Sequence, residues 1–128
     1  MLRKFMFVMF ALACSNAHAE WSRISYFDQG DFYIDRATIA RVGDHREVWS
    51  MLDYRSPKMD SNGKIYRSSR SMLQFQCENK MARAIHMSFY SGSMLRGNEI
   101  SKMGSLKEWA AVPPDTPIRE ILRVVCAN

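Results

Sequence analysis

The sequence is short of the residues that build metal centres. It has three cysteines and three histidines in 128 residues, whereas a structural zinc site needs about four ligands at short spacings. Asp28, Asp31 and Asp35 do not have the spacing of a calcium loop. We therefore expect no metal and no cofactor.

The sequence also lacks the motifs that carry common catalytic chemistry. No serine has the G-x-S-x-G context of a nucleophile elbow, and GSMLRG lacks the ending of a phosphate loop. His45 and His86 are candidates for acid–base chemistry, because imidazole titrates near neutrality. Nothing in the sequence brings them together, so we expect two unrelated exposed histidines and a protein that is not an enzyme. A small hydrolase that uses one of them is the least favoured alternative.

Long apolar runs are absent except near the N-terminus. There, Arg3 and Lys4 precede an apolar run at residues 5–13, and the small residues of Ala17-His18-Ala19 follow. The run is too short to span a bilayer about 30 Å thick as a helix. This order is typical of a secretory signal peptide. We predict a signal peptide at residues 1–19, cleavage between Ala19 and Glu20, and one mature domain at residues 20–128.

A second N-terminal processing route stays open. Ala11-Leu12-Ala13-Cys14 resembles a lipoprotein box, with alanine where leucine is preferred. Lipidation of Cys14 would attach the mature protein to a membrane, whereas cleavage before Glu20 would release it as a soluble chain. We favour cleavage before Glu20, and we expect membrane attachment only if Cys14 is lipidated. Either route places the protein in the periplasm or on the outer cell surface.

The mature chain has little excess charge. The formal net charge of the whole chain is +5, and it falls to +3 because Arg3 and Lys4 leave with the signal peptide and no acidic residue does. The charges are well mixed rather than gathered in a basic stripe, so we expect no nucleic acid as a partner. Cys77 and Cys126 are the only ordinary thiols left, and an even pair in an oxidising compartment predicts a disulfide.

The middle of the chain has the period of two that is typical of half-buried strands. In residues 66–77 one face carries Leu73, Phe75 and Cys77. In residues 81–90 we expect Ile85, Met87 and Phe89 to point inward, and Ala84 and His86 outward. The short connection ENK makes these two strands an antiparallel hairpin.

Further strands are expected nearer the N-terminus. WSRISYF at residues 21–27 suits an edge strand, and DFYID and REVWSMLDY are two more strands. We expect residues 55–64 to form a loop, because Ser56-Pro57 and Asn62-Gly63 are turn signals.

The C-terminal segment changes to a helical period. Its apolar residues recur at helical spacing at Ile118, Ile121, Leu122, Val125 and Cys126. Thr116 is a suitable N-cap and Pro117 a suitable first helical residue. Because Cys126 and Cys77 both lie on apolar faces, packing the helix on the sheet brings the sulfurs together. We predict an α+β fold: an antiparallel sheet of about five to six strands, with one C-terminal helix docked by the disulfide.

The ordered set of segments resembles the surface-adhesin protein E family of Gram-negative bacteria. The segments are FYIDRATIARVGDHREVWSMLDY, YRSSRSMLQFQC, FYSGSMLRGNEI and EWAAVPPDTPIREILRVVC. The resemblance implies an antiparallel sheet with a C-terminal helix tied by Cys77 and Cys126. It also implies a non-catalytic adhesin that binds host extracellular-matrix or plasma proteins and is able to form a homodimer. The family's namesake is a lipoprotein, from which residues 11–14 depart. The alternative is a soluble periplasmic regulator or inhibitor of another protein.

Recognition must use loops or outer faces, because the inward faces of the strands are committed to the core. The most basic such segment contains the candidate partner-binding residues Arg55, Lys58, Lys64, Tyr66, Arg67 and Arg70. Arginine and tyrosine are among the residue types that most often anchor interfaces. The open alternative is a solvated surface that keeps the protein soluble.

Overall fold

The computed structural model describes residues 19–104 and 108–127, which form an antiparallel sheet and one C-terminal helix. Six strands follow the order β1-β2-β4-β5-β6-β7, and the short strands β3 and β8 pair with β4 and β6. The bounds are β1 Trp21–Phe27, β2 Gly30–Asp35, β3 Ala40–Val42, β4 His45–Met59, β5 Ile65–Gln76, β6 Met81–Tyr90, β7 Glu99–Met103, β8 Ala110–Ala111 and α1 Pro117–Cys126. The α+β prediction is confirmed, and the eight strands exceed the expected five to six because β3 and β8 are too short to leave a sequence pattern.

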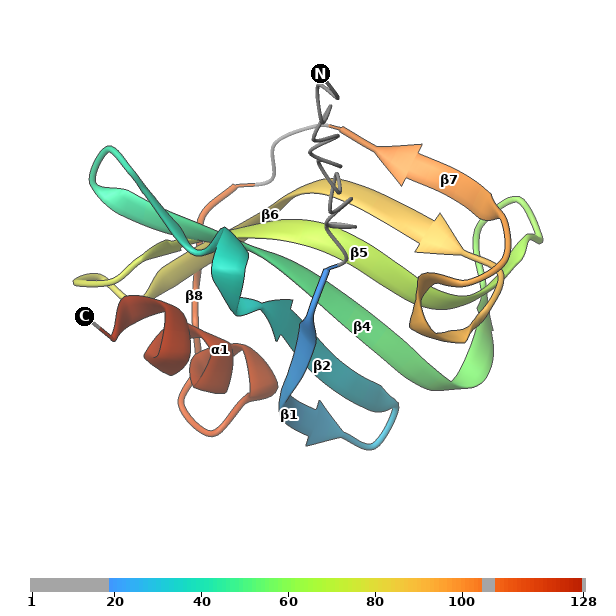
Figure 1. The fold of residues 1–128 in the computed structure, drawn as a ribbon, viewed down its shortest axis with the longest axis horizontal. Coiled ribbons are helices and arrows are strands. Elements are labelled where there is room, and N and C mark those ends of the chain that lie inside the picture. Colours follow the sequence, from blue (N-terminus) through green and yellow to red (C-terminus); the bar gives the residue numbers. More distant parts are fainter. Residues whose placement is uncertain (1–18, 105–107, 128) are drawn as a thin grey trace, which may run out of the picture.

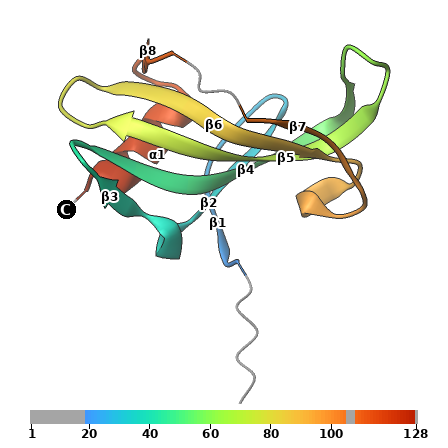
Figure 2. The ribbon, with the colours of Figure 1, turned by 90° about the horizontal axis from the view of Figure 1, so that it is seen from above.

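The long strands β4, β5 and β6 give the sheet two distinct ends. In Figures 1 and 2, α1 lies at one end of these strands and the β4–β5 hairpin at the other. We call the first the helix end and the second the distal end. The distal end also carries η2, a short 3-10 helix at Ser93–Leu95 between β6 and β7. The predicted edge strand at residues 21–27 is confirmed as β1, the first strand of the sheet.

The hydrophobic core lies between α1 and one face of the helix end. Val48 pairs with Leu73 across β4 and β5, so both side chains project from the same face. These two residues and Phe75 are buried against the helix residues Ile121 and Val125. The apolar stripe expected on the helix is therefore the surface that fills the core.

The helix begins and ends with its backbone groups satisfied. Thr116 accepts a hydrogen bond from the Arg119 amide at 3.3 Å, and Pro117 is the first helical residue, as predicted. At the other end, the Arg46 guanidinium donates to the carbonyls of Val125 and Ala127, both at 3.0 Å. A cation is favoured at this negative end of the helix dipole.

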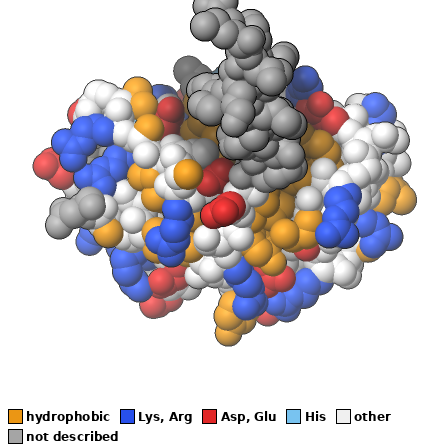
Figure 3. All heavy atoms as spheres, in the orientation of Figure 1, with side chains coloured by type: hydrophobic (Ala, Val, Ile, Leu, Met, Phe, Trp, Pro, Cys, Tyr) orange, Lys and Arg blue, Asp and Glu red, His pale blue; other side chains and the backbone are white. Residues whose placement is uncertain are grey.

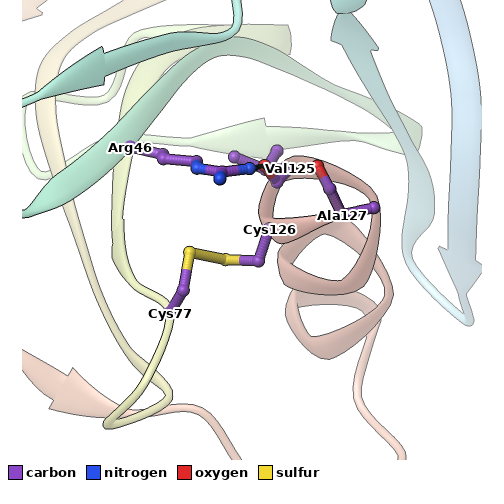
Figure 4. The surroundings of a disulfide bond; sticks show 5 residues. All are labelled: Arg46, Cys77, Val125, Cys126 and Ala127. Carbon is purple, nitrogen blue, oxygen red and sulfur yellow. Dashed lines mark hydrogen bonds between the residues drawn. A yellow bond between two sulfur atoms is a disulfide. The ribbon is translucent and has the colours of Figure 1, made fainter.

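The predicted disulfide joins the same end of the helix to the sheet. Cys77 follows β5 and bonds to Cys126, with their Cα atoms 5.7 Å apart and Arg46 beside them (Figure 4). The sheet therefore holds the end of α1 by one covalent bond and two charge-assisted hydrogen bonds.

The prediction of which β6 side chains point inward is partly wrong. Ala84, which we expected to point outward, pairs with Leu73 and packs against the core, whereas Ile85 pairs with Met72 on the opposite face and is buried there. The register then shifts at a bulge where His86 has a φ of +51°. An extra residue in one strand reverses which side chains face inward beyond it.

The expected loop at residues 55–64 is mostly strand. β4 continues to Met59 and β5 begins at Ile65, so the turn is confined to residues 60–64. Pro57 fits because the pairing of β4 with β5 is interrupted between Asp53 and Lys58. The position of the turn agrees with the Asn62-Gly63 turn signal in the sequence. The Asp60 carboxylate accepts the amides of Asn62 and Lys64, and Gly63 has a φ of +79°.

Candidate functional site

Three aromatic rings stack across the distal end of the sheet. The Tyr54 and Tyr66 ring centroids are 5.5 Å apart, and those of Tyr66 and Phe89 are 4.9 Å apart, both edge to face. The rings come from the neighbouring strands β4, β5 and β6. Phe89 pairs with Ser69, which pairs with Leu52, and this register puts Phe89 on the same sheet face as the core. The stack thus continues the apolar face beyond α1.

The Tyr54 hydroxyl is partly buried at the edge of this stack. Burial raises the pKa of the Tyr54 phenol above its ordinary value of 10.0, and a hydrogen bond with Ser69 opposes that rise. Tyr54 therefore stays a neutral hydrogen-bonding group throughout the physiological range.

A cavity of about 220 Å³ opens beside the rings. Tyr66 and Phe89 line it from the sheet, the turn at residues 60–62 closes one side, and Ser101 and Met103 of β7 close another. Aromatic walls with a few polar groups suit an inserted apolar side chain better than a small charged ligand.

Apolar side chains are also exposed at the distal end of the sheet. Met59 and Ile65, which pair directly at the end of the β4–β5 hairpin, are 65% and 52% exposed. Met103 is exposed on β7. Figure 3 shows hydrophobic and basic side chains next to one another at the right-hand side of the molecule, where the distal end lies. We call the aromatic stack, its cavity and the exposed Met103 the distal surface, whereas Met59 and Ile65 project from the face opposite Tyr66. Clustered exposed apolar groups with a polar rim mark interaction sites.

Several basic residues lie at the distal end of the sheet. Arg55 lies 3.4 Å from the Asp31 carboxylate, Lys58 donates to the Gln29 side chain at 2.9 Å, and Lys64 donates to the Ile100 carbonyl at 3.3 Å. Lys58 and Lys64 contact neutral oxygen atoms, and Arg55 shares the Asp31 carboxylate with Arg23. The rim of the distal surface therefore carries Lys58 and Lys64, and Asp60 is an acidic residue in the lining of its cavity.

The Asp31 carboxylate pairs with two arginines at this end of the sheet. Its partial desolvation acts to raise the pKa, but hydrogen bonds and charge interactions with Arg23 and Arg55 outweigh it and lower the pKa of Asp31 below its ordinary value of 3.8. Asp31 is consequently ionised at neutral pH and orients both arginines.

The loop after β6 covers the other face of the distal end. The Asp53 carboxylate accepts hydrogen bonds from the Ser93 hydroxyl and the Met94 amide, and the Ser68 hydroxyl accepts the Leu95 amide. Met94 and Leu95 both have positive φ values, of 54° and 62°, which cost free energy in residues other than glycine. The hydrogen bonds from β4 and β5 hold this strained loop in place.

The comparisons with known proteins agree with this fold. A family model described as surface-adhesin protein E matches residues 21–127. The chain belongs to the surface-adhesin protein E family. A structure of Haemophilus influenzae protein E is similar with a TM-score of 0.64 and 16% identity, over 87% of this chain and 86% of that one. Protein E from non-typeable Haemophilus influenzae gives a TM-score of 0.63 and 18% identity, over 89% and 80%. A search of curated proteins gives no match.

The structure divides the predicted partner-binding residues of this adhesin-family chain between two faces. Lys58 and Lys64 border the distal surface, and Tyr66 is part of its stack. Arg55 reaches Asp31, which pairs with Asp53 on the opposite face. Arg70 lies on the opposite face, where its guanidinium stacks 3.6 Å from the centre of the Trp49 ring. Arg67 is exposed on β5.

Sequence reasoning missed the apolar part of the surface. It assigned Phe89 to the core, and it left out Met103 of β7, which lines the cavity and is exposed.

The two histidines do not form a site in the described residues. His45 is not exposed as expected: its side chain is 18% exposed and its ring packs edge-on against Trp109, 5.7 Å away. His86 is exposed at the bulge of β6, and no hydrogen bond joins the two within the described ranges. A second cavity, of about 340 Å³, lies at the helix end beside Arg41, Arg46 and Cys77.

Two further searches concern metals and membranes. Among the described residues, no group of three or more histidine, cysteine, aspartate and glutamate side chains is placed to hold a metal ion. No helix in residues 19–104 and 108–127 is long and apolar enough to cross a membrane.

Proposed function

We propose that the mature protein is an exported, non-catalytic binding protein that attaches to a protein partner through the distal surface. Membership of the surface-adhesin protein E family supports an adhesin-like role. The observation that carries the proposal is a cavity lined by the aromatic rings of Tyr66 and Phe89, with the exposed Met103 in its wall. Partners of this class include host extracellular-matrix and plasma proteins.

The physical logic of the distal surface is that of a binding hot spot. Apolar and aromatic side chains that lose water on contact supply most of the affinity of an interface, and a polar rim surrounds them. Lys58 and Lys64 at the rim, with Arg55 nearby on the other face of the same end, would attract acidic partners and speed their association. The helix end, by contrast, uses its apolar groups internally.

Export belongs to the same proposal. The predicted signal peptide and the Cys14 lipidation site lie outside the described residues, apart from Ala19. The intact mass of the exported protein distinguishes cleavage before Glu20 from a lipidated Cys14 chain. Protease treatment of intact cells then separates surface display from a periplasmic regulator or inhibitor, since only a displayed protein is digested.

The binding test uses mammalian plasma and solubilised extracellular matrix as probes of the immobilised mature protein. Changing Arg55, Lys58 and Lys64 together to Ser should slow association about tenfold at low salt, with a nearly unchanged melting temperature. The matched control changes Arg41, Lys80 and Arg123 to Ser, which removes the same charge at the helix end. An association rate equal in both triple variants would move the site away from the distal surface.

A further inference from the structure

The edge of the sheet next to the distal surface offers unpaired backbone. We propose that a partner binds by adding an acidic, extended segment as a new strand along β7, with one apolar side chain in the cavity lined by Tyr66 and Phe89. This inference rests on the proposed function, because it specifies how the distal surface holds its partner. Strand addition combines backbone hydrogen bonds, which give affinity, with pockets for alternate side chains, which give specificity.

The two edges of the sheet are not equivalent. β1 and β7 are the end strands of the main sheet order. β1 contacts α1, which packs beside it. In the described residues no strand lies beyond β7, and Figures 1 and 2 show its outer side free along its length. β7 is therefore the edge at which a further strand can pair.

The register places the cavity within reach of that new strand. Ser101 pairs with Phe89 and Met103 pairs with Met87, so the Ser101 and Met103 side chains lie on the same sheet face as Phe89. Both residues of β7 also line the cavity. A residue of the added strand opposite Ser101 or Met103 would project from that same face. Its side chain would then stand over the mouth of the cavity.

The charges of this edge select the kind of segment that can pair. Lys102 is well exposed and only 3.7 Å from Glu99, a weak surface pair. Lys64 reaches the Ile100 carbonyl at 3.3 Å from the neighbouring hairpin. Ile100 is the extra residue where the β6–β7 register shifts. Lysines and bulges on an edge discourage pairing with ordinary strands. An acidic segment that neutralises the two lysines removes that obstacle.

The test uses phage-displayed random 12-residue peptides selected on the disulfide-bonded chain of residues 20–128. We expect the selected peptides to alternate apolar and acidic residues and to lack proline at the centre. Binding of a synthesised peptide should slow hydrogen exchange at the amides of residues 99–103. Methylating alternate peptide nitrogens in one register should abolish binding, whereas methylation in the other register should leave the affinity within about twofold, because only one set faces β7.

Two variants separate the contributions of charge and cavity. Lys64→Glu with Lys102→Glu should weaken peptide binding at least about tenfold, whereas the control pair Arg41→Glu with Lys80→Glu should not. Ser101→Tyr should block the cavity and weaken binding with the lysines intact. Circular dichroism of each variant verifies the fold.

The outcomes separate the two proposals. One outcome would overturn strand addition but leave the distal surface as a binding site. In that outcome, peptide binding requires the two lysines and tolerates methylation in both registers, and it does not change hydrogen exchange at the amides of β7. The absence of selected peptides, or binding that no distal variant affects, would overturn both. Protection of β7 that appears on concentrating the protein alone, together with a dimer mass, would assign the edge to a second copy and overturn the acidic-peptide proposal.

Discussion

The two ends of the sheet use similar side chains for opposite purposes. At the helix end, Phe75 is buried under α1, and both hydrogen bonds that Arg46 makes go to carbonyls at the end of the helix. At the distal end, the rings of Tyr66 and Phe89 border an open cavity, and Lys58 and Lys64 stand at its rim. The comparison teaches that the same sheet face can supply stability where it is covered and recognition where it is not.

The largest expected difference between the two ends is the loss in free energy of unfolding when a phenylalanine ring is removed. Phe75→Ala should lower the free energy of unfolding by about 3–5 kcal/mol, because it leaves a cavity under the helix. Phe89→Ala should cost less than about 2 kcal/mol, because its ring is already beside open space. Urea unfolding of both variants measures the difference. Equal losses would mean that the distal surface is part of the stabilising core.

The disulfide provides the next effect. Cys126→Ser should lower the free energy of unfolding by about 2–5 kcal/mol, because the unfolded chain gains conformational freedom. Binding at the distal surface should persist at temperatures where the variant is folded. The double variant Cys77→Ser with Cys126→Ser is the control for effects of a free thiol. Two free thiols titrated in the unfolded, unreduced wild type would remove the basis of this prediction.

A pair of arginine variants compares the ends directly. Arg46→Met should cost about 1–3 kcal/mol, because two helix carbonyls lose a charged donor. Arg55→Met should cost less than about 0.5 kcal/mol, because its pair with Asp31 is exposed to water. Thermal unfolding of the two variants gives the comparison, and a larger loss for Arg55→Met would contradict it.

The smallest effect is a pH dependence at Asp31. Because the folded-state pKa of Asp31 is lowered from 3.8, its ionised form stabilises the folded protein above pH 4 or so. That contribution is lost as the pH falls through the folded-state pKa. Asp31→Asn should therefore flatten the acid limb of the stability curve, measured by urea unfolding between pH 2 and 6 or so. A curve parallel to that of the wild type would show that the two arginines do not stabilise the carboxylate.

Sequence patterns predicted the helix end better than the distal end, and the reason is locality. Thr116, Pro117 and the apolar stripe are adjacent in the chain and specify a helix without reference to the sheet. The disulfide between Cys77 and Cys126 could be predicted from the even number of cysteines and the oxidising compartment alone. The helix end was therefore predicted down to its cap.

The distal end depends on how strands pair. The bulge at His86 reverses the faces of β6, and the interruption after Asp53 lets β4 pass through Pro57. Neither event has a local signature, since a register shift is set by the partner strand. For the same reason, the sequence placed Arg70 and Lys64 in one candidate binding segment, although they lie on opposite faces of the sheet.

The bond between Cys77 and Cys126 also closes a covalent ring, because the two residues are 49 positions apart. The ring contains β6, η2, β7 and β8 and most of α1, including the edge strand and half of the distal surface. A protease that cuts anywhere inside this ring opens one peptide bond but releases no fragment. A nicked molecule would therefore stay in one piece, with both sides of the cut still tethered to the sheet.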